Sequence, residues 1–207
     1  MATFTKTSIA CDALLALGQE PISNLDDTSD PNAIRIKSIF DYNVHRLQAR
    51  DWLFNRARVQ LAQLVTGPAF GTWKYRYTIP AGSINIRGLC DLYSDEILYP
   101  YQREGQYIFS NVEDAYLLYN ELLSDVSLWP GWFCNLLSAV IGYRMAPKLI
   151  PNDSWIMKRM KEERDESWID AMSGNGQDSY FEDAHGDSNG NDDVTYGGRE
   201  RYDAFNL

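Results

Sequence analysis

Histidine side chains are the first candidates for chemistry in this chain, because they titrate near neutral pH and bind metals. There are two of them: His45 lies within a helical pattern and His185 lies near the C-terminus. General acid–base catalysis and zinc binding both use such groups in combination. Neither histidine has a second histidine or a cysteine near it in the sequence. We therefore predict no catalytic residue, no metal site, no cofactor and no enzymatic activity.

Carboxylates are the second kind of candidate. The acidic pairs Asp26-Asp27 and Asp192-Asp193 resemble loose cation-binding sites, although solvated turns explain them better. The sequence motifs of serine hydrolases, HExxH metalloproteases and P-loop proteins are absent. Glycoside hydrolysis needs two carboxylates at a set separation in space, which the sequence alone does not give. An enzyme that degrades the cell wall therefore stays open as the alternative function.

The cysteines, Cys11, Cys90 and Cys134, are odd in number and far apart, and no CxxC pair is present. This pattern predicts reduced, buried thiols in a protein made in the cytoplasm rather than a disulfide framework. The N-terminus resembles an amphipathic helix and not a signal peptide. No stretch reaches the roughly 18 apolar residues that a membrane span needs, so we expect no membrane partner.

The overall charge limits how the chain can meet nucleic acid. Its 207 residues carry a formal net charge of −10 at pH 7. Such an excess of acids argues against wrapping nucleic acid through phosphate contacts. It is compatible with a passage through which DNA slides, because a repulsive wall prevents adhesion.

Residues 30–55 organise the chain, because they combine a long helix with the start of an extended segment. Asp30 is expected to cap this helix and Pro31 to occupy its first position. Apolar residues then recur at three- and four-residue steps: Ala33, Ile36, Ile39, Phe40, Val44 and Leu47. Phe40 and Val44 are therefore predicted to lie in a helical core. From Trp52 onward, alternation replaces this pattern, and Phe54 is expected to begin a strand.

The remaining pattern predicts a first helix over residues 6–17, stopped by Gly18, that packs antiparallel to the long helix. Strands are expected over 54–64, 72–79, 84–92, 96–99 and 101–110, the last of these a hairpin turning at Gly105. Residues 114–123 are predicted as a further strand, with a helix as the rival interpretation. The sequence therefore indicates a β-rich region over residues 52–123.

Two helices are expected after the β-rich region. The first begins near the cap Ser127, is buried all round, and ends at Pro147 and Pro151. The second covers residues 153–171 and is capped by Asn152 or Asp153. Its predicted core contacts are Trp155, Ile156, Met160 and Trp168.

The composition changes after Met172. Residues 173–207 contain six glycines, eight acids and two arginines. Because they have little apolar area to offset the entropy of ordering, we predict a flexible acidic tail in the free chain. The end of the tail is rich in anchor-type residues and is predicted to be an assembly tether that orders on a partner: Tyr196, Arg199, Arg201, Tyr202, Phe205 and Leu207.

Several short segments, taken in order, resemble the head-to-tail adaptors of short-tailed phages, the tail tubular protein A family. They are GQEPISNL at 18–25, QARDWLFN at 48–55, YRYTIP at 75–80, the hairpin at 103–109 and the helix from Trp129. The resemblance covers roughly residues 5–170 and rests on the ordered set. The family usually has glycine at Asp51 and commonly an aspartate at Gly82. Because aspartate tolerates a positive φ better than most residues, we expect the turn at Asp51 to survive.

The patterns and the resemblance together predict an α+β fold, a helical bundle with a β-rich insertion, and the composition adds a flexible acidic C-terminal tail. Residues 1–172 form the adaptor domain, with helices over 5–50 and 127–171 and the β insertion over 52–123, and residues 173–207 form the tail. The family-motif core is Phe40, Val44, Trp52 and Phe54.

The resemblance also implies a structural virion protein at the head–tail neck. It predicts a homo-oligomeric ring, twelve-fold in the family, that binds the portal protein on one side and the tail nozzle protein on the other. Tail fibres are a further partner that the resemblance allows. Double-stranded genomic DNA would pass through the lumen without specific binding.

Overall fold

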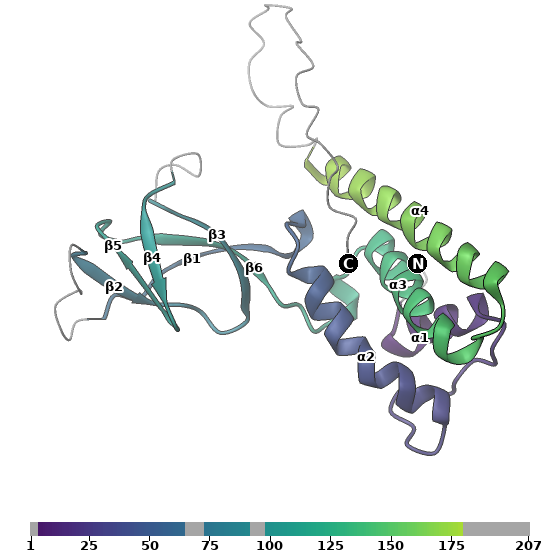
Figure 1. The fold of residues 1–207 in the computed structure, drawn as a ribbon. Helices are drawn as coiled ribbons and strands as arrows, with labels where there is room; N and C mark the ends of the chain where they lie inside the picture. The colour runs from purple at the N-terminus through teal and green to yellow at the C-terminus, as the bar shows by residue number, and fades with distance from the viewer. Residues whose placement is uncertain (1–3, 65–72, 92–97, 180–207) are drawn as a thin grey trace, which may run out of the picture.

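The computed structural model describes residues 4–64, 73–91 and 98–179, and its fold is α+β, as predicted (Figure 1). A helical bundle lies at one end of the molecule and a β-rich part at the other. The bundle contains α1 (Lys6–Ala16), α2 (Pro31–Gln48), α3 (Gly131–Leu149) and α4 (Ser154–Ser179). The β-rich part is inserted between α2 and α3.

The caps of the first two helices explain where these begin. Thr5 accepts a hydrogen bond from the backbone N–H of Ser8, whose side chain in turn bonds the backbone of Thr5, which makes a capping box. The side chain of Asp30 accepts from the N–H groups of Asn32 and Ala33, and Pro31 is the first residue of α2. The predicted cap and first position of the long helix are therefore confirmed.

The core of the bundle is built around α3. Phe40 and Val44 of α2 are buried in it, as predicted, together with residues of α1, α3 and α4. The predicted antiparallel pair of α1 and α2 is wrong, because each of them packs mainly on α3. Gly142 of α3 lies where the three helices meet: a Cβ at that position would stand 3.3 Å from Sδ of Met160 in α4 and at ordinary contact distance from Ala13 in α1.

The predicted start of the buried helix α3 is wrong, whereas its predicted end is confirmed. Ser127 lies in a 3-10 turn, η2 (Val126–Leu128), which Asp125 caps, and α3 begins only after Pro130. At the other end, the helix includes Pro147 and ends at Leu149, between the two prolines that were expected to end it. A proline in the last turn removes only one intrahelical hydrogen bond, so the helix runs on for two residues.

The last helix, α4, is capped by Asp153 as predicted, but it continues to Ser179 rather than ending at residue 171. The predicted flexible tail therefore begins too early, because residues 173–179 are helical. Gly174 explains the difference: a Cβ there would stand 2.5 Å from Trp132 of α3, so this glycine serves close packing and not flexibility. Trp155 was predicted to be a core residue and is instead 65% exposed. Met160 is buried, and Ile156 and Trp168 are partly buried against the core.

The chain leaves α2 through a 3-10 turn, η1 (Leu53–Asn55), so the first strand starts two residues later than predicted. The strands are β1 (Arg56–Gln60), β2 (Tyr75–Thr78), β3 (Ser83–Cys90), β4 (Tyr101–Glu104), β5 (Tyr107–Ser110) and β6 (Tyr116–Glu121). The rival helix for residues 114–123 is thus excluded. The strand expected at 96–99 starts outside the described residues, and Leu98 and Tyr99 are not in a strand.

The six strands form two antiparallel three-stranded sheets, ordered β1-β6-β3 and β2-β5-β4. The β4–β5 hairpin turns at Gly105, whose φ of +58° favours glycine, as the sequence predicts. Side chains from both sheets meet in a second core, separate from that of the bundle: Leu61, Tyr77, Leu89, Ile108, Ala115, Leu117 and Tyr119. Within the described ranges, no helix has the length and apolar character that crossing a bilayer requires.

Truncating Phe40 tests the assignment of the bundle core. Phe40→Ala is expected to lower the free energy of unfolding by about 3–5 kcal/mol, because it removes buried area and leaves a cavity. Ile34→Ala, on the same helix at a position that is 50% exposed, is the matched control and should change it by less than about 1 kcal/mol. Urea denaturation measures both, and equal effects of the two variants would contradict the assignment.

The two glycines near the end of α4 allow a sharper test of the helix boundary. At Gly176 a Cβ meets nothing within 4 Å, so Gly176→Ala should stabilise the protein by about 0.5–1 kcal/mol through helix propensity. Gly174→Ala should destabilise it, because the new methyl group collides with the rigid ring of Trp132. Thermal melts of both variants check this. If both raise the melting temperature, residues 173–179 do not pack on α3.

Candidate functional site

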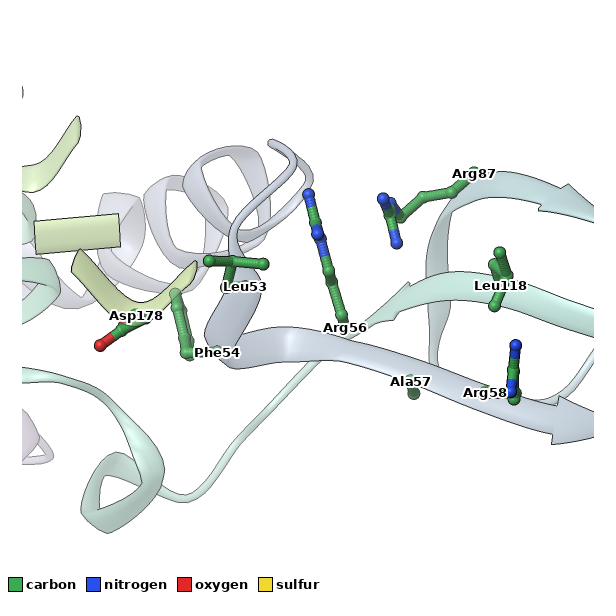
Figure 2. Close-up of a pocket in the computed structure, with 8 residues that line it drawn as sticks. All are labelled: Leu53, Phe54, Arg56, Ala57, Arg58, Arg87, Leu118 and Asp178. Atoms are coloured by element: carbon green, nitrogen blue, oxygen red, sulfur yellow. The ribbon is translucent and has the colours of Figure 1, made fainter. Parts of the chain in front are cut away.

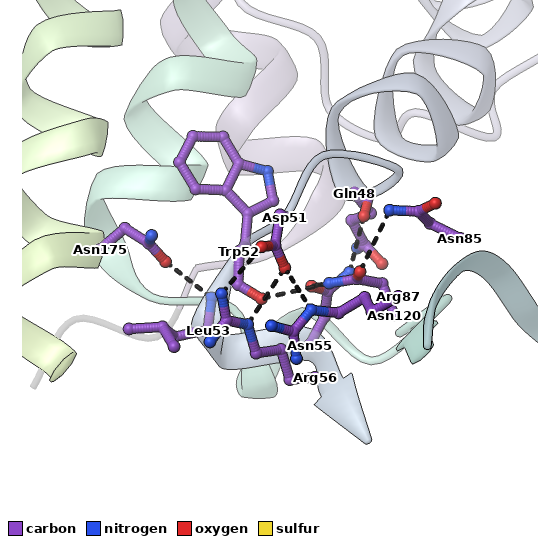
Figure 3. Close-up of polar contacts among 10 residues, drawn as sticks. All are labelled: Gln48, Asp51, Trp52, Leu53, Asn55, Arg56, Asn85, Arg87, Asn120 and Asn175. Atoms are coloured by element: carbon purple, nitrogen blue, oxygen red, sulfur yellow. Dashed lines mark hydrogen bonds and ion pairs between the residues drawn. The ribbon is translucent and has the colours of Figure 1, made fainter. Parts of the chain in front are cut away.

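The junction between the bundle and the β-rich part is held by buried amide side chains (Figure 3). Gln48 is the last residue of α2 and is fully buried. Its side chain accepts a hydrogen bond from the backbone N–H of Leu123 (2.8 Å) and donates one to the carbonyl oxygen of the same residue (3.0 Å). Because Leu123 follows β6, this pair of bonds ties the end of α2 to the segment that returns to the bundle.

Two asparagines continue the network. The Nδ2 group of Asn55 donates to the backbone carbonyl oxygens of Gln48 (2.8 Å) and Glu121 (3.2 Å). Asn120 donates to Oδ1 of Asn55 (2.8 Å) and to the carbonyl oxygen of Trp52 (3.2 Å). Both asparagines are buried, so their bonds compensate for desolvation that would otherwise be costly.

Aromatic packing supports the same junction from the side of the bundle. Trp52 is 1% exposed, donates its indole N–H to the carbonyl oxygen of Leu47 (2.7 Å), and packs its ring near Trp132 and Trp168. Phe54 is partly buried against the ring of Phe133, at 4.9 Å between centroids. The structure thus brings Trp52 and Phe54 together at the junction. Phe40 and Val44 lie earlier in α2, away from the junction, in the bundle core.

Asp51 occupies the outer edge of the junction. Its carboxylate binds Arg56 of β1 (2.9 Å) and Arg87 of β3 (2.8 Å). The expected positive φ at Asp51 is wrong, because Asp114 is the one non-glycine residue in the described part of the chain with φ above zero. Asp51 is half-exposed, so each ion pair is worth about 0–1 kcal/mol. Gly82, the other departure from the family, has a φ of +87°, which a glycine adopts without strain.

A cleft of about 750 Å³ opens beside this edge (Figure 2). Arginines from two strands of one sheet surround it, and α4 contributes an aspartate from its last turn. The lining residues are Leu53, Phe54, Arg56, Ala57, Arg58, Arg87, Leu118 and Asp178. Guanidinium groups bind carboxylates and phosphates through paired hydrogen bonds, so the cleft suits an anionic group. Among the described residues that line the cleft there is no histidine, cysteine or serine.

The histidine and the acidic pair predicted from sequence lie apart from the cleft. His45 is exposed on α2. The hydrogen bond and charge of Lys37 lower the pKa of Asp26, and hydrogen bonds from Ser29 lower that of Asp27, so both carboxylates belong to a satisfied turn. His185, the pair Asp192-Asp193 and all the tether residues from Tyr196 to Leu207 lie outside the described residues.

The three cysteines are free, as expected, but they differ in burial. Cys90 and Cys134 are buried, whereas Cys11 is only partly buried. Desolvation raises the pKa of the Cys134 thiol to about 11, which makes it a poor nucleophile at neutral pH. In the part of the chain that the structure describes, no cluster of histidine, cysteine and acidic residues could hold a metal ion.

Sequence reasoning missed the amides of the junction. Gln48 directly follows Leu47, the last residue of the apolar stripe, and Asn120 interrupts the apolar alternation of β6. A polar side chain inside an apolar pattern was the available signal, but its partners lie 65 or more residues away in sequence. The sequence around Gln48 and Asn120 therefore does not show which residues they bond.

No model of a known protein family matches the chain, and no curated protein is significantly similar to it.

The amide network generates a prediction about stability. Gln48→Ala removes both bonds to Leu123 and leaves the partly buried backbone N–H of Leu123 unpaired. We therefore expect a loss of about 2–3 kcal/mol in the free energy of unfolding. Gln60→Ala, at an exposed position of β1, is the control and should cost less than about 0.5 kcal/mol. Urea denaturation of the two variants checks this. A Gln48→Ala variant as stable as Gln60→Ala would mean that the network does not hold the junction.

Proposed function

We propose that the chain is a structural subunit of a ring that connects a capsid portal to a tail nozzle at the head–tail neck of a virion. Genomic DNA passes through the lumen of this ring. The observation that carries the proposal is the order of the elements. A β-rich part is inserted between the second and third helices of a bundle, which is the arrangement that the resemblance to tail tubular protein A implies.

The rigid junction supports this proposal. Closed rings form only when each subunit repeats the same rotation to its neighbour, so the parts of a subunit must keep a fixed orientation. The buried bonds of Gln48, Asn55 and Asn120 give the two parts of this chain such an orientation.

Exposed apolar residues on both the bundle and the β-rich part also support a ring. A ring of more than two copies uses head-to-tail contacts, in which two different surfaces of each subunit meet. Trp155 at the start of α4 is 65% exposed and stacks with Arg159, which reaches the end of α1. Leu122 and Leu98 are exposed on the β-rich part. These surfaces are distinct, as head-to-tail contacts require.

No observation favours the alternative, a wall-degrading enzyme. Glycoside hydrolysis uses two carboxylates, and Asp178 is the one carboxylate among the residues that line the cleft.

The proposal predicts that the purified chain joins purified portal protein in a complex with a single stoichiometry. Light scattering measures the mass of the complex, and electron micrographs show a ring coaxial with the portal. A chain that stays monomeric alone and with portal at micromolar concentrations would contradict the proposal.

The tether residues provide a variant for this experiment. Replacing Tyr202, Phe205 and Leu207 by alanine in the full chain should weaken portal binding at least tenfold, because it removes the apolar anchors, each worth about 1.5–3 kcal/mol when buried. Replacing His185, Asn189 and Asn191 by alanine is the matched control and should leave the affinity unchanged. If both triple variants bind portal equally well, the segment 196–207 is not a tether.

A further inference from the structure

Three helices of the bundle and the turn after α2 bring four arginines together on one face. They are Arg46 of α2, Arg50 in the turn that follows α2, Arg144 of α3 and Arg164 of α4. We call this group the arginine–aromatic face. Figure 1 shows α2 and α4 on either side of α3, which is how residues far apart in sequence come to share it.

Arginines stacked on aromatic rings link α3 to α2, the turn after α2 to α4, and α4 to α3. The contacts are Arg144 with Tyr42 at 5.3 Å, Arg50 with Trp168 at 5.0 Å and Arg164 with Tyr143 at 4.3 Å. Such contacts hold the planar guanidinium groups in fixed orientations. These arginine side chains have therefore already lost conformational entropy on folding, so they lose less of it when a ligand binds.

The positive charges on this face repel one another. Burial lowers the pKa of Arg46, and the charges of Arg144, Arg50 and Arg164 lower it further. Arg164 is paired with its neighbour Asp165. The other three arginines have no carboxylate within 4.0 Å among the residues that the structure describes. The whole chain has ten more acidic than basic residues, yet these arginines lie together without a carboxylate partner for each of them.

The dipole of α2 explains only part of this arrangement. Arg46 lies in the last turn of α2, where a cation is favoured. Arg144, however, is more than one turn from the end of α3, and Arg164 lies in the middle of α4. Stabilisation of individual helices by their dipoles therefore does not explain why the four arginines cluster on one face.

We propose that the arginine–aromatic face binds the acidic stretch 182–193 of the same chain. This stretch contains five carboxylates and neither lysine nor arginine: its acids are Glu182, Asp183, Asp187, Asp192 and Asp193. Its charge is complementary to the face, and carboxylates are the groups that guanidinium forks bind best.

Chain length permits this contact within one molecule. The structure describes α4 to its end at Ser179, and Arg164 lies 15 residues earlier, about 22 Å back along the helix. An extended chain covers about 3.3 Å per residue, so about seven residues after Ser179 suffice to return that far. Asp187, Asp192 and Asp193 lie beyond that number and can reach every arginine of the face. Connection through so short a segment gives a millimolar effective concentration, at which a weak ionic contact is populated.

Protease cleavage before aspartate tests the proposal on the full chain. Endoproteinase Asp-N can cut before Asp187 and Asp192, inside the stretch, and before Asp203, outside it. At low salt we expect cleavage at Asp187 and Asp192, relative to Asp203, to be about fivefold slower than in a free peptide of residues 180–207, because docking lowers the accessible fraction. The protection should disappear at 0.5 M NaCl, where charges are screened beyond a few ångströms.

A double variant and its control locate the contact. Arg50→Gln with Arg144→Gln should restore the cleavage ratio of the free peptide at low salt. Arg35→Gln with Arg103→Gln removes two exposed arginines elsewhere and should leave the protection intact. Equal cleavage ratios in the wild type and the free peptide at low salt would overturn the proposal. So would protection that grows with protein concentration, because a second copy would then supply the stretch. Neither outcome depends on portal binding or ring formation.

Discussion

The two ends of the β-rich part meet the bundle at one buried polar junction, and the shape of the molecule depends on it. The chain leaves the bundle after α2 and returns before α3, so both crossings lie side by side. Gln48 bonds Leu123 in the segment that returns to the bundle, while Asn55 bonds both Gln48 at the end of α2 and Glu121 at the end of β6. Apolar residues could fill the same volume, but they would allow the two parts to slide. Hydrogen bonds with fixed directions set one orientation.

The junction is stiff because polar and aromatic contacts share residues. The indole of Trp52 donates to α2, while its carbonyl oxygen accepts from Asn120 of β6. The face of the same ring contacts Trp132 and Trp168 in α3 and α4. A rotation of the β-rich part would therefore have to break hydrogen bonds and separate packed rings at the same time. Residues in one such network are coupled, so their contributions to stability are not additive.

What the sequence predicted well was local. The cap at Asp30 and the stripe through Phe40 and Val44 depend on residues within a few turns of one another, as does the hairpin at Gly105. The failures have a different origin. Gly174 falls in the predicted flexible tail because residues 173–207 have little apolar area to offset the entropy of ordering. Only the position of Trp132, far away in sequence, gives this glycine a packing role. The arginine cleft was not foreseen either, because β1 and β3 become neighbours only through β6.

The C-terminal half of α4 connects the two arginine-rich surfaces through the junction. Trp168 contacts both Arg50 on the arginine–aromatic face and Trp52 in the junction. Two turns later, Asn175 accepts a hydrogen bond from the backbone N–H of Leu53, and Asp178 lines the cleft. An anion that moved Arg50 would therefore act on the ring that orders Trp52, and a ligand in the cleft would act on the same helix from its other end. Since Trp168, Asn175 and Asp178 all lie on α4, the arginine–aromatic face, the junction and the cleft share this one helix.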